Sequence, residues 1–245
     1  MEVLAACHLH SAWSYDGSWP IETMVDAFVR RGYRAMMMTE HENGFTQARY
    51  AEFRAECERL TSERMYVLPG IEYSDPENRV HVLVWGTPFL GEGLRTEALL
   101  DAVASAGGVA IFAHPSRRAA WECFTPRWAE TLLGIEAWNR KYDGWAPGDA
   151  AAALLEANAQ APFVGLDFHT ARQFFPLGMA LELAGEISER TVLECLKQRR
   201  CAPRAFGLPL DHRSFHRTLP LLHVAEQGRR RLAALKRYSK ARLSS

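Results

Sequence analysis

The sequence predicts an α/β protein, and two observations carry that prediction. Short, almost continuously apolar runs alternate with amphipathic segments along the chain, which is the pattern of repeated strand–helix units. The apolar runs have the composition of strands that are covered on both faces, as parallel strands usually are. Seven such units over roughly 200 residues indicate a small barrel, whose functional groups are expected at the carboxyl ends of the strands.

The expected elements follow from this alternation. The strands are expected at residues 2–9, 34–39, 65–72, 109–113, 134–138, 163–167 and 178–183. The helices are expected at residues 20–31, 45–60, 94–106, 126–132, 147–160 and 188–199. Pro20 suits the first turn of the first helix, and Gly32 suits its end. Residues 75–78 form a turn signal, so residues 65–74 and 79–86 are expected to pair as a hairpin.

The charge of the chain is divided unevenly, although 29 basic and 29 acidic residues give a formal net charge of zero. Residues 197–245 hold 13 Lys and Arg against Asp211 and Glu226, a net charge of +11, so residues 1–196 carry −11. We expect residues 1–203 to form the barrel domain and residues 204–245 a basic extension packed on or beside it, ending in a helix over 224–243. The extension is interpreted either as a solvated arginine-rich helix or as a contact for an anionic substrate or partner.

The composition excludes a disordered chain, a collagen-like chain and a small disulfide-rich scaffold. With 48% hydrophobic and 24% charged residues, the chain has the make-up of a globular protein with a sizeable core. No apolar run reaches the roughly 18 residues that span a bilayer, and the first residues lack the pattern of a signal peptide. The five cysteines form no C-x-x-C pair. We therefore expect free thiols, a cytoplasmic location and no membrane partner.

Residue types that bind metals recur at the ends of the expected strands. His8 and His10 end the first strand, and side chains at i and i+2 of a strand leave on the same face, so both imidazoles can reach one cation. A single H-x-H is a weak signal. The same residue types follow at Asp16, His41, Glu72, His81, His114, Asp167 and His169.

Each of these side chains has a simpler explanation when taken alone. His41 could cap a helix, Glu72 could form an ion pair, and His114 could be an ordinary loop histidine. Nine imidazoles and carboxylates converging on one edge would nevertheless be costly to bury without cations. A nitrogen and oxygen set without thiolate suits two or three divalent or trivalent ions of zinc, manganese or iron. No organic cofactor is expected.

The ordered motifs resemble the polymerase and histidinol phosphatase (PHP) superfamily. They are H-x-H at 8–10, D-G at 16–17, T-E-H at 39–41, G-I-E at 70–72, His81, A-H-P at 113–115 and D-x-H at 167–169. The resemblance covers about 200 residues. It implies a distorted (β/α)7 barrel of the PHP type with a trinuclear metal site and phosphoester-hydrolysing activity. Tyr15 stands where the family commonly has Ser, and Glu40 where Asp usually precedes the histidine.

The resemblance also implies how the ligands divide among three ions. The first ion takes His8, His10, Glu72 and Asp167; the second shares Glu72 and adds His81 and His114; the third takes Asp16, His41 and His169. His81 is the weakest assignment, because the stretch before it varies in length across the family. Close metal ions lower the pKa of a bound water, so a metal-bound hydroxide is expected to attack phosphorus without a serine or cysteine nucleophile.

Cationic and aromatic residues near the strand ends are the candidates for substrate binding. We expect Asp16, His41 and His169 to act in catalysis together with Arg117 and Arg172, which lie close in sequence to ligands. The further cationic candidates are Arg118, Arg140 and Lys141. The aromatic candidates for stacking on a ring, each of which core packing would also explain, are Trp13, Trp19, Trp138, Trp145 and Phe168. His212 and His216 are expected to be structural.

The predicted function is a metal-dependent phosphoesterase, a phosphatase or phosphodiesterase, acting on a small phosphorylated metabolite, with a nucleotide as one candidate. A histidinol-phosphate phosphatase is one alternative. A nuclease acting on nucleic-acid ends is another, with the basic extension as its electrostatic contact, although nucleic acid is not the favoured partner. The remaining alternatives are a non-phosphate metal hydrolase of the amidohydrolase kind and a binding protein with vestigial metals. The oligomeric state does not follow from the sequence.

Overall fold

The strands of the computed structural model form two six-stranded sheets within residues 1–158, 160–210 and 220–243, the part of the chain that the structure describes. The first sheet has the order β12 (Leu208–Pro209), β11 (Cys201–Ala205), β10 (Leu177–Glu182), β1 (Glu2–Leu9), β2 (Ala35–Met38) and β4 (Tyr66–Leu68). The second has the order β3 (Glu40–His41), β5 (Gly70–Ser74), β6 (His81–Trp85), β7 (Val109–Phe112), β8 (Gly134–Asn139) and β9 (Ala161–Gly165).

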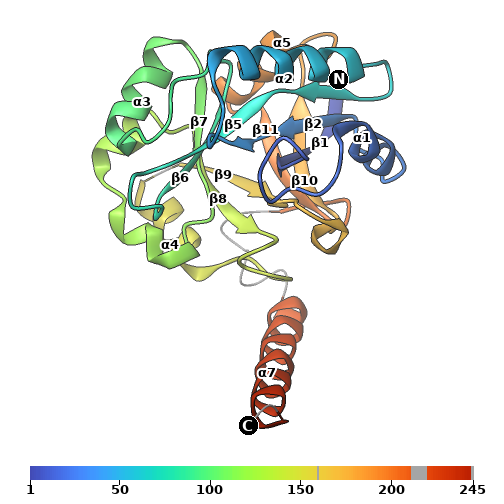
Figure 1. Cartoon of the computed structure of the whole chain (residues 1–245), viewed down its shortest axis with the longest axis vertical. Coiled ribbons are helices and arrows are strands. Elements are labelled where there is room, and N and C mark those ends of the chain that lie inside the picture. The colour runs from blue at the N-terminus through green and yellow to red at the C-terminus, as the bar shows by residue number, and fades with distance from the viewer. Residues whose placement is uncertain (159, 211–219, 244–245) are drawn as a thin grey trace.

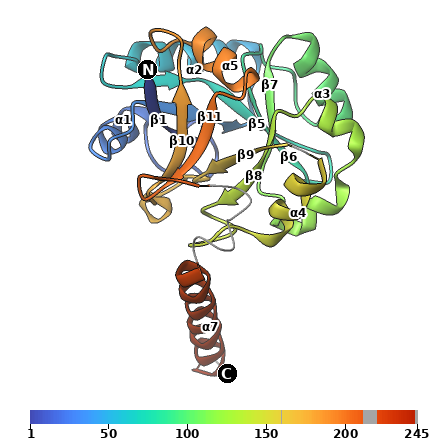
Figure 2. The same cartoon turned by 180° about the vertical axis from the view of Figure 1, so that it is seen from behind.

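Helices cover the outside of these sheets (Figure 1). They are α1 (Ile21–Val29), α2 (Gln47–Leu60), α3 (Thr96–Ser105), α4 (Asp149–Asn158) and α5 (Glu189–Lys197). Three short 3₁₀ segments occupy Arg117–Cys123, Pro126–Glu130 and Ala171–Gln173. The last helix, α7 (Pro220–Leu243), projects from the body and carries the C-terminal end away from it, as both views show (Figures 1 and 2).

The two sheets meet along the carboxyl end of β1. Leu9 pairs with Phe168 in an isolated bridge. The backbone N–H groups of Leu166 and Phe168 donate to the carbonyls of Cys7 (2.9 Å) and His8 (3.0 Å). The edge where ligands were expected is therefore the junction of the sheets. The hydrogen-bonding pattern divides the strands into two sheets, and the (β/α)7 barrel stays a prediction.

The chain passes from the first sheet to the second at two breaks between strands, one of them inside an expected strand. Residues 65–72 divide at Pro69 into β4, which pairs with β2, and β5, which pairs with β3 and β6. Proline has no backbone N–H to donate, so the ladder ends there. The second expected strand, 34–39, is present as β2, which ends at Met38 in the first sheet, and the unpredicted β3 follows it in the second sheet. Each break comes immediately before a segment that holds a candidate ligand, His41 or Glu72.

Most other expectations on the elements are confirmed. The hairpin is present as β5 and β6, paired antiparallel from Gly70–Trp85 to Ser74–His81. The predicted helix at 126–132 is a 3₁₀ segment instead, with Pro126 in its first turn. The short strands β3, β11 and β12 were not predicted. The division at residues 203/204 stays a prediction, and β11 runs across it.

All five cysteines are described, and each is a free thiol. Among the described helices, none combines the length and the apolar character needed to cross a membrane.

Candidate metal centre

The candidate ligands come from strand ends whose backbone is locally strained. His8, His114 and Asp167 have φ values of 59°, 25° and 48°, in a region that non-glycine residues rarely occupy. Such conformations cluster at functional sites, where the surrounding structure holds them in place. The register between β1 and β2 also shifts between Cys7 and Leu9, so His8 lies in an irregularity of its strand.

Because of this irregularity, the two histidines of the H-x-H motif lie side by side for a different reason than the one expected. Simple alternation does not apply across a residue with φ of 59°. The rings of His8 and His10 nevertheless lie 5.2 Å apart between centroids. Their Nε2 atoms lie 3.4 Å and 3.3 Å from the carboxylate of Glu72. The expected juxtaposition is present, but a bulge produces it.

Glu72 lies at the centre of the cluster. Its Oε1 is 2.8 Å from Nδ1 of His81 and 2.9 Å from Nε2 of His114. Its Oε2 is 3.1 Å from Nδ1 of His41. Burial alone would raise the pKa of this carboxyl, but the surrounding imidazoles, led by His81 and His8, outweigh burial and hold its pKa well below the usual range. A charged carboxylate in the middle of five imidazoles is suited to sharing between cations.

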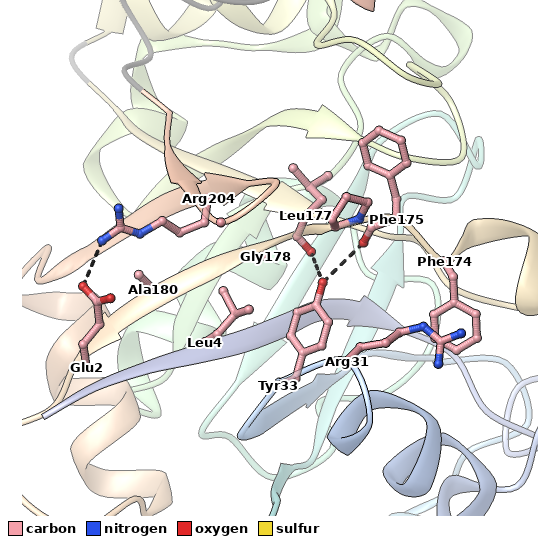
Figure 3. A pocket seen from close by; sticks show the side chains of 12 residues that line it. Glu2, Leu4, Arg31, Tyr33, Phe174, Phe175, Leu177, Gly178, Ala180 and Arg204 are labelled. Atoms are coloured by element: carbon pink, nitrogen blue, oxygen red, sulfur yellow. Dashed lines mark hydrogen bonds and ion pairs between the residues drawn. The ribbon is translucent and has the colours of Figure 1, made fainter.

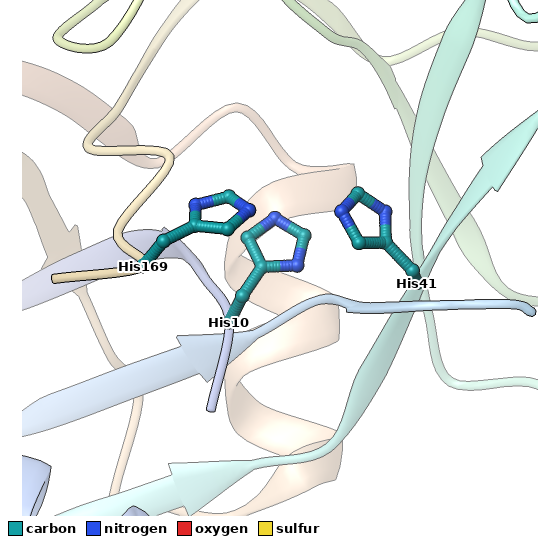
Figure 4. A group of neighbouring side chains, drawn as sticks. All are labelled: His10, His41 and His169. Atoms are coloured by element: carbon teal, nitrogen blue, oxygen red, sulfur yellow. The ribbon is translucent and has the colours of Figure 1, made fainter. Parts of the chain in front are cut away.

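Asp167 and Asp16 complete the cluster on its other side. Asp167 Oδ1 lies 3.7 Å from Nε2 of His10 and 3.3 Å from Nδ1 of His169. Asp16 receives His41 Nε2 at 3.3 Å on one oxygen and His169 Nε2 at 3.0 Å on the other. Figure 4 shows the rings of His10, His41 and His169 facing one another, with centroids 4.3 Å and 4.2 Å from His10.

The structure thus gathers all nine predicted ligands. Four groups of three have donor atoms within 4.8 Å of one another: His10, His41 and His169; His8, His10 and Glu72; His8, His114 and Asp167; Glu72, His81 and His114. The group of Glu72, His81 and His114 is the set predicted for the second ion, and that of His8, His10 and Glu72 is part of the set predicted for the first. The other two groups combine ligands predicted for different ions. That division stays a prediction.

The donor set fits divalent metal ions. The Nε2 atoms of His8 and His10 are buried and have no hydrogen-bond partner among the described residues. A buried polar atom without a partner costs free energy, and a coordinated cation would remove that cost. The ligating atoms are nitrogens and oxygens without thiolate, as zinc, manganese and iron sites accept.

A buried carboxylate that the sequence analysis did not single out orients two of the ligands. Glu136, on β8, has Oε1 2.8 Å from Nδ1 of His8. Its Oε2 accepts hydrogen bonds from the backbone N–H of His114 (2.7 Å) and from the side chain of Asn139 (2.9 Å). A Cβ at Gly165 would overlap this carboxylate, so only glycine fits there. The available signal was an acid inside the apolar strand 134–138.

Glu40 supports His10 through a serine. Its carboxylate accepts hydrogen bonds from Ser11 Oγ (2.6 Å) and Ser14 Oγ (2.5 Å). Ser14 Oγ in turn lies 3.3 Å from Nδ1 of His10 and accepts the backbone N–H of His41 at 2.9 Å. Outer partners of this kind fix the ring orientation of ligands.

A cavity of about 350 Å³ opens onto this cluster. Its wall includes the ligands Asp16, His41 and His81 together with side chains that touch ligands from outside. Tyr15 is 74% exposed and stacks on the ring of His41 at 5.0 Å. Tyr142 lies 4.7 Å from the ring of His114. Two tyrosines therefore flank the mouth of the cavity.

The aromatic residues expected in this role lie elsewhere. Trp138 and Phe168 are buried in the core. Trp13 packs on Phe45 and Phe53, and Trp19 packs on Phe168 and Phe174. Trp145 faces Arg229 of α7. Core packing was thus the correct explanation for most of them.

Two cationic side chains line the cavity. The guanidinium of Arg117 donates to the carbonyl of Asn78 (2.7 Å), to its Oδ1 (2.9 Å) and to Tyr142 Oη (3.1 Å). Lys141 Nζ lies 3.2 Å from Asp167 Oδ1 and 3.3 Å from His169 Nε2. Arg172 is exposed and does not line this cavity. His212 and His216 lie outside the described residues.

Two further cavities lie outside the cluster of ligands. One, of about 650 Å³, adjoins the first, shares Arg117 and Tyr142 with it, and is closed on one side by α7. The other is an apolar groove of about 660 Å³ beside β1 and β10, where Tyr33 Oη donates to the carbonyl of Leu177 at 2.9 Å (Figure 3). None of the nine candidate ligands lines that groove.

Comparison with known proteins finds similar sequences for part of this chain. The family model of the PHP domain matches residues 6–106, which contain six of the nine ligands. A stretch of 73 residues is 34% identical to the DNA polymerase/3′-5′ exonuclease PolX of Bacillus subtilis, covering 26% of this chain and 13% of the polymerase. The match therefore spans only a small part of that relative.

Solved structures share the fold. A two-domain protein of Bacteroides vulgatus containing a predicted PHP-like metal-dependent phosphoesterase has a TM-score of 0.66 and 19% identity, over 86% of this chain and 67% of that one. PsfC of Pseudomonas syringae has a TM-score of 0.64 and 18% identity, over 93% and 98% of the two chains. The chain thus carries a stretch that matches the PHP domain, at residues 6–106, and it shares the fold of these two structures.

Proposed function

We propose that this protein is a phosphatase or phosphodiesterase that hydrolyses a small phosphorylated metabolite with the help of two or three zinc, manganese or iron ions. The observation that carries the proposal is the clustering of nine imidazoles and carboxylates beside one cavity, whose wall holds three of them together with Arg117 and Lys141. Bound ions in such a site polarise phosphate oxygens and lower the pKa of a water.

The side chains of this protein have defined tasks in that reaction. The nine ligands hold the ions, while Glu136 and the Glu40–Ser14 pair keep His8 and His10 in orientation. Lys141 and Arg117 bind the phosphate oxygens. Two of the donors of Arg117 are already held by Asn78, so its guanidinium is oriented before the substrate arrives.

The size and rim of the cavity favour a small substrate that carries a ring. A volume of about 350 Å³ is at the lower end of small-molecule sites. Tyr15 and Tyr142 offer aromatic faces at the mouth, to which a nucleobase or another flat ring binds well. A nucleotide is therefore our preferred substrate class, and histidinol phosphate, whose imidazole is also a ring, is the alternative.

A nuclease activity is the second candidate. The likeness to a polymerase and exonuclease and the arginines of α7 favour it. Binding through such a helix would fall steeply with salt, whereas turnover of a small substrate in the cavity would not. An amidohydrolase site, in which a modified lysine bridges the metal ions, is less well supported. The carboxylate of Glu72 occupies the central position of this cluster instead.

Metal analysis followed by a panel of phosphomonoesters and phosphodiesters tests the proposal. We expect at least one tightly bound ion per chain and turnover that chelation removes and manganese, iron or zinc restores. The His10→Ala variant should lose both the bound ion and the turnover. Glu194→Gln, on the surface of α5, is the matched control and should keep both. A chain that binds no metal and does not respond to added metal would contradict the proposal.

A further inference from the structure

The loop after β8, residues 140–148, supplies two of the groups at the mouth of the cavity. Lys141 reaches Asp167 and His169, and the ring of Tyr142 lies against His114. The body of the protein holds the inner side of this loop. The carboxylate of Asp143 accepts hydrogen bonds from Ser116 Oγ (2.6 Å) and from the backbone N–H of Asn139 (2.8 Å).

Helix α7 holds the outer side of the same loop through one carboxylate. Glu226 is 4% exposed, and its Oε2 accepts the backbone N–H of Trp145 at 3.1 Å. Arg230 of the same helix donates to the carbonyl of Asp143 at 2.8 Å. Gly144 has φ of 85°, and a Cβ there would overlap the Glu226 carboxylate. The loop therefore bends around this side chain.

The charge of Glu226 is compensated within its own helix. Arg229 donates to both carboxylate oxygens at 2.7 Å and 2.5 Å, and Arg230 donates to Oε1 at 2.7 Å. A carboxylate that is removed from water needs such partners. Burial would raise the pKa of Glu226, but the bonds from Arg229 and Arg230 outweigh burial and lower it to about 2.

We propose that Glu226 is a positioning residue of the active site: by seating α7 on residues 143–145, it holds Lys141 and Tyr142 against the metal ligands. What these two residues bind rests on the proposed function, whereas the seating does not. The seated helix also closes the cavity that adjoins the site. Two arginines of the basic extension thus act on the loop of this same chain, and this role requires no nucleic acid.

Hydrogen–deuterium exchange on the full-length protein tests the seating directly. In Glu226→Ala we expect the backbone amides of residues 140–148 to exchange roughly 10-fold faster than in the wild type, because the loop opens locally more often. Glu226→Gln keeps the volume and should give a smaller increase. Glu194→Gln breaks a matched i,i+4 pair with Arg190 on α5 and should leave this segment unchanged.

The kinetic readout separates positioning from simple structural support. With manganese and p-nitrophenyl phosphate, the Glu226 variants should raise KM at least about threefold while metal content and melting temperature stay near the wild-type values. Unchanged exchange in a folded variant, or faster exchange with unchanged KM, would overturn the proposal. If Glu226→Ala does not fold, the same exchange and KM measurements on Glu226→Gln test the proposal. Faster exchange in a protein whose wild type hydrolyses no phosphoester would support the seating and contradict the proposed function.

Discussion

The floor and the rim of the cavity are built in different ways. We call the cluster of nine candidate ligands, onto which the cavity opens, its floor; these ligands are fixed by strand ends and by buried carboxylates such as Glu136. The rim consists of Tyr15, Arg117, Lys141 and Tyr142. Arg117 is held by Asn78, and the loop that carries Lys141 and Tyr142 also contacts α7. The difference implies that the floor determines which chemistry takes place, and the rim determines which molecule undergoes it.

The largest expected effect is at the centre of the floor. Glu72→Gln keeps the volume but removes the charge that five imidazoles face. We expect a loss of kcat of about 1,000-fold or more, together with loss of bound metal, measured by elemental analysis and phosphoesterase assay. A variant that kept its metal and its rate would show that the floor is not the reaction site.

A smaller effect is expected one layer further out. Glu136→Gln removes the carboxylate that holds His8, and losses of this kind typically cost about 10- to 100-fold in metal affinity or activity. Titration with manganese, followed by activity, measures it. An effect as large as that of Glu72→Gln would mean that Glu136 is itself a ligand.

At the rim, two arginines that are both close in sequence to ligands should behave differently. Arg117→Gln should raise KM roughly 10-fold with less change in kcat, because Arg117 lines the cavity. Arg172→Gln should have no measurable effect, because that side chain is exposed and outside the cavity. Equal effects of the two substitutions in the same steady-state assay would show that lining the cavity does not give Arg117 a role that Arg172 lacks.

The smallest effect is expected at Tyr15. Tyr15→Ser removes an aromatic face from the mouth of the cavity without touching a ligand bond. We expect kcat/KM for a nucleotide to fall about threefold to tenfold, with little change for a ringless substrate such as glycerol phosphate. Parallel assays of the two substrates measure the ratio. If both substrates were affected equally, Tyr15 would act through His41 instead.

The sequence was informative about the floor because ligands at strand ends obey local rules. His41, Glu72, His114 and Asp167 each follow or end an apolar run, and the topology brings such ends together. The local rule for His8 and His10 gave the correct pairing for an incomplete reason, since the bulge at His8 requires long-range packing. The break at Pro69, which separates β4 from β5, also requires the partner strands to be known.

The rim was less predictable because the distance of a residue from a ligand in the sequence does not tell where its side chain points. Arg172 lies three residues from His169, yet the turn capped by Thr170 leaves it exposed. Lys141 is far from any ligand in the chain, and it reaches Asp167 from a loop that Asn139 and Asp143 help to shape. The contact of Glu226 with Trp145 spans 81 residues and left no local pattern.

The junction between the two sheets has a thermodynamic consequence. His8 lies at the end of β1 in one sheet and His10 directly follows it, whereas Glu72 and His81 lie in strands of the other sheet and His114 follows one of them. An ion bound between them would act as a cross-link joining the two halves of the molecule. Because a ligand that binds only the folded state stabilises it in proportion to the logarithm of its concentration, the melting temperature should report on metal supply as faithfully as activity does.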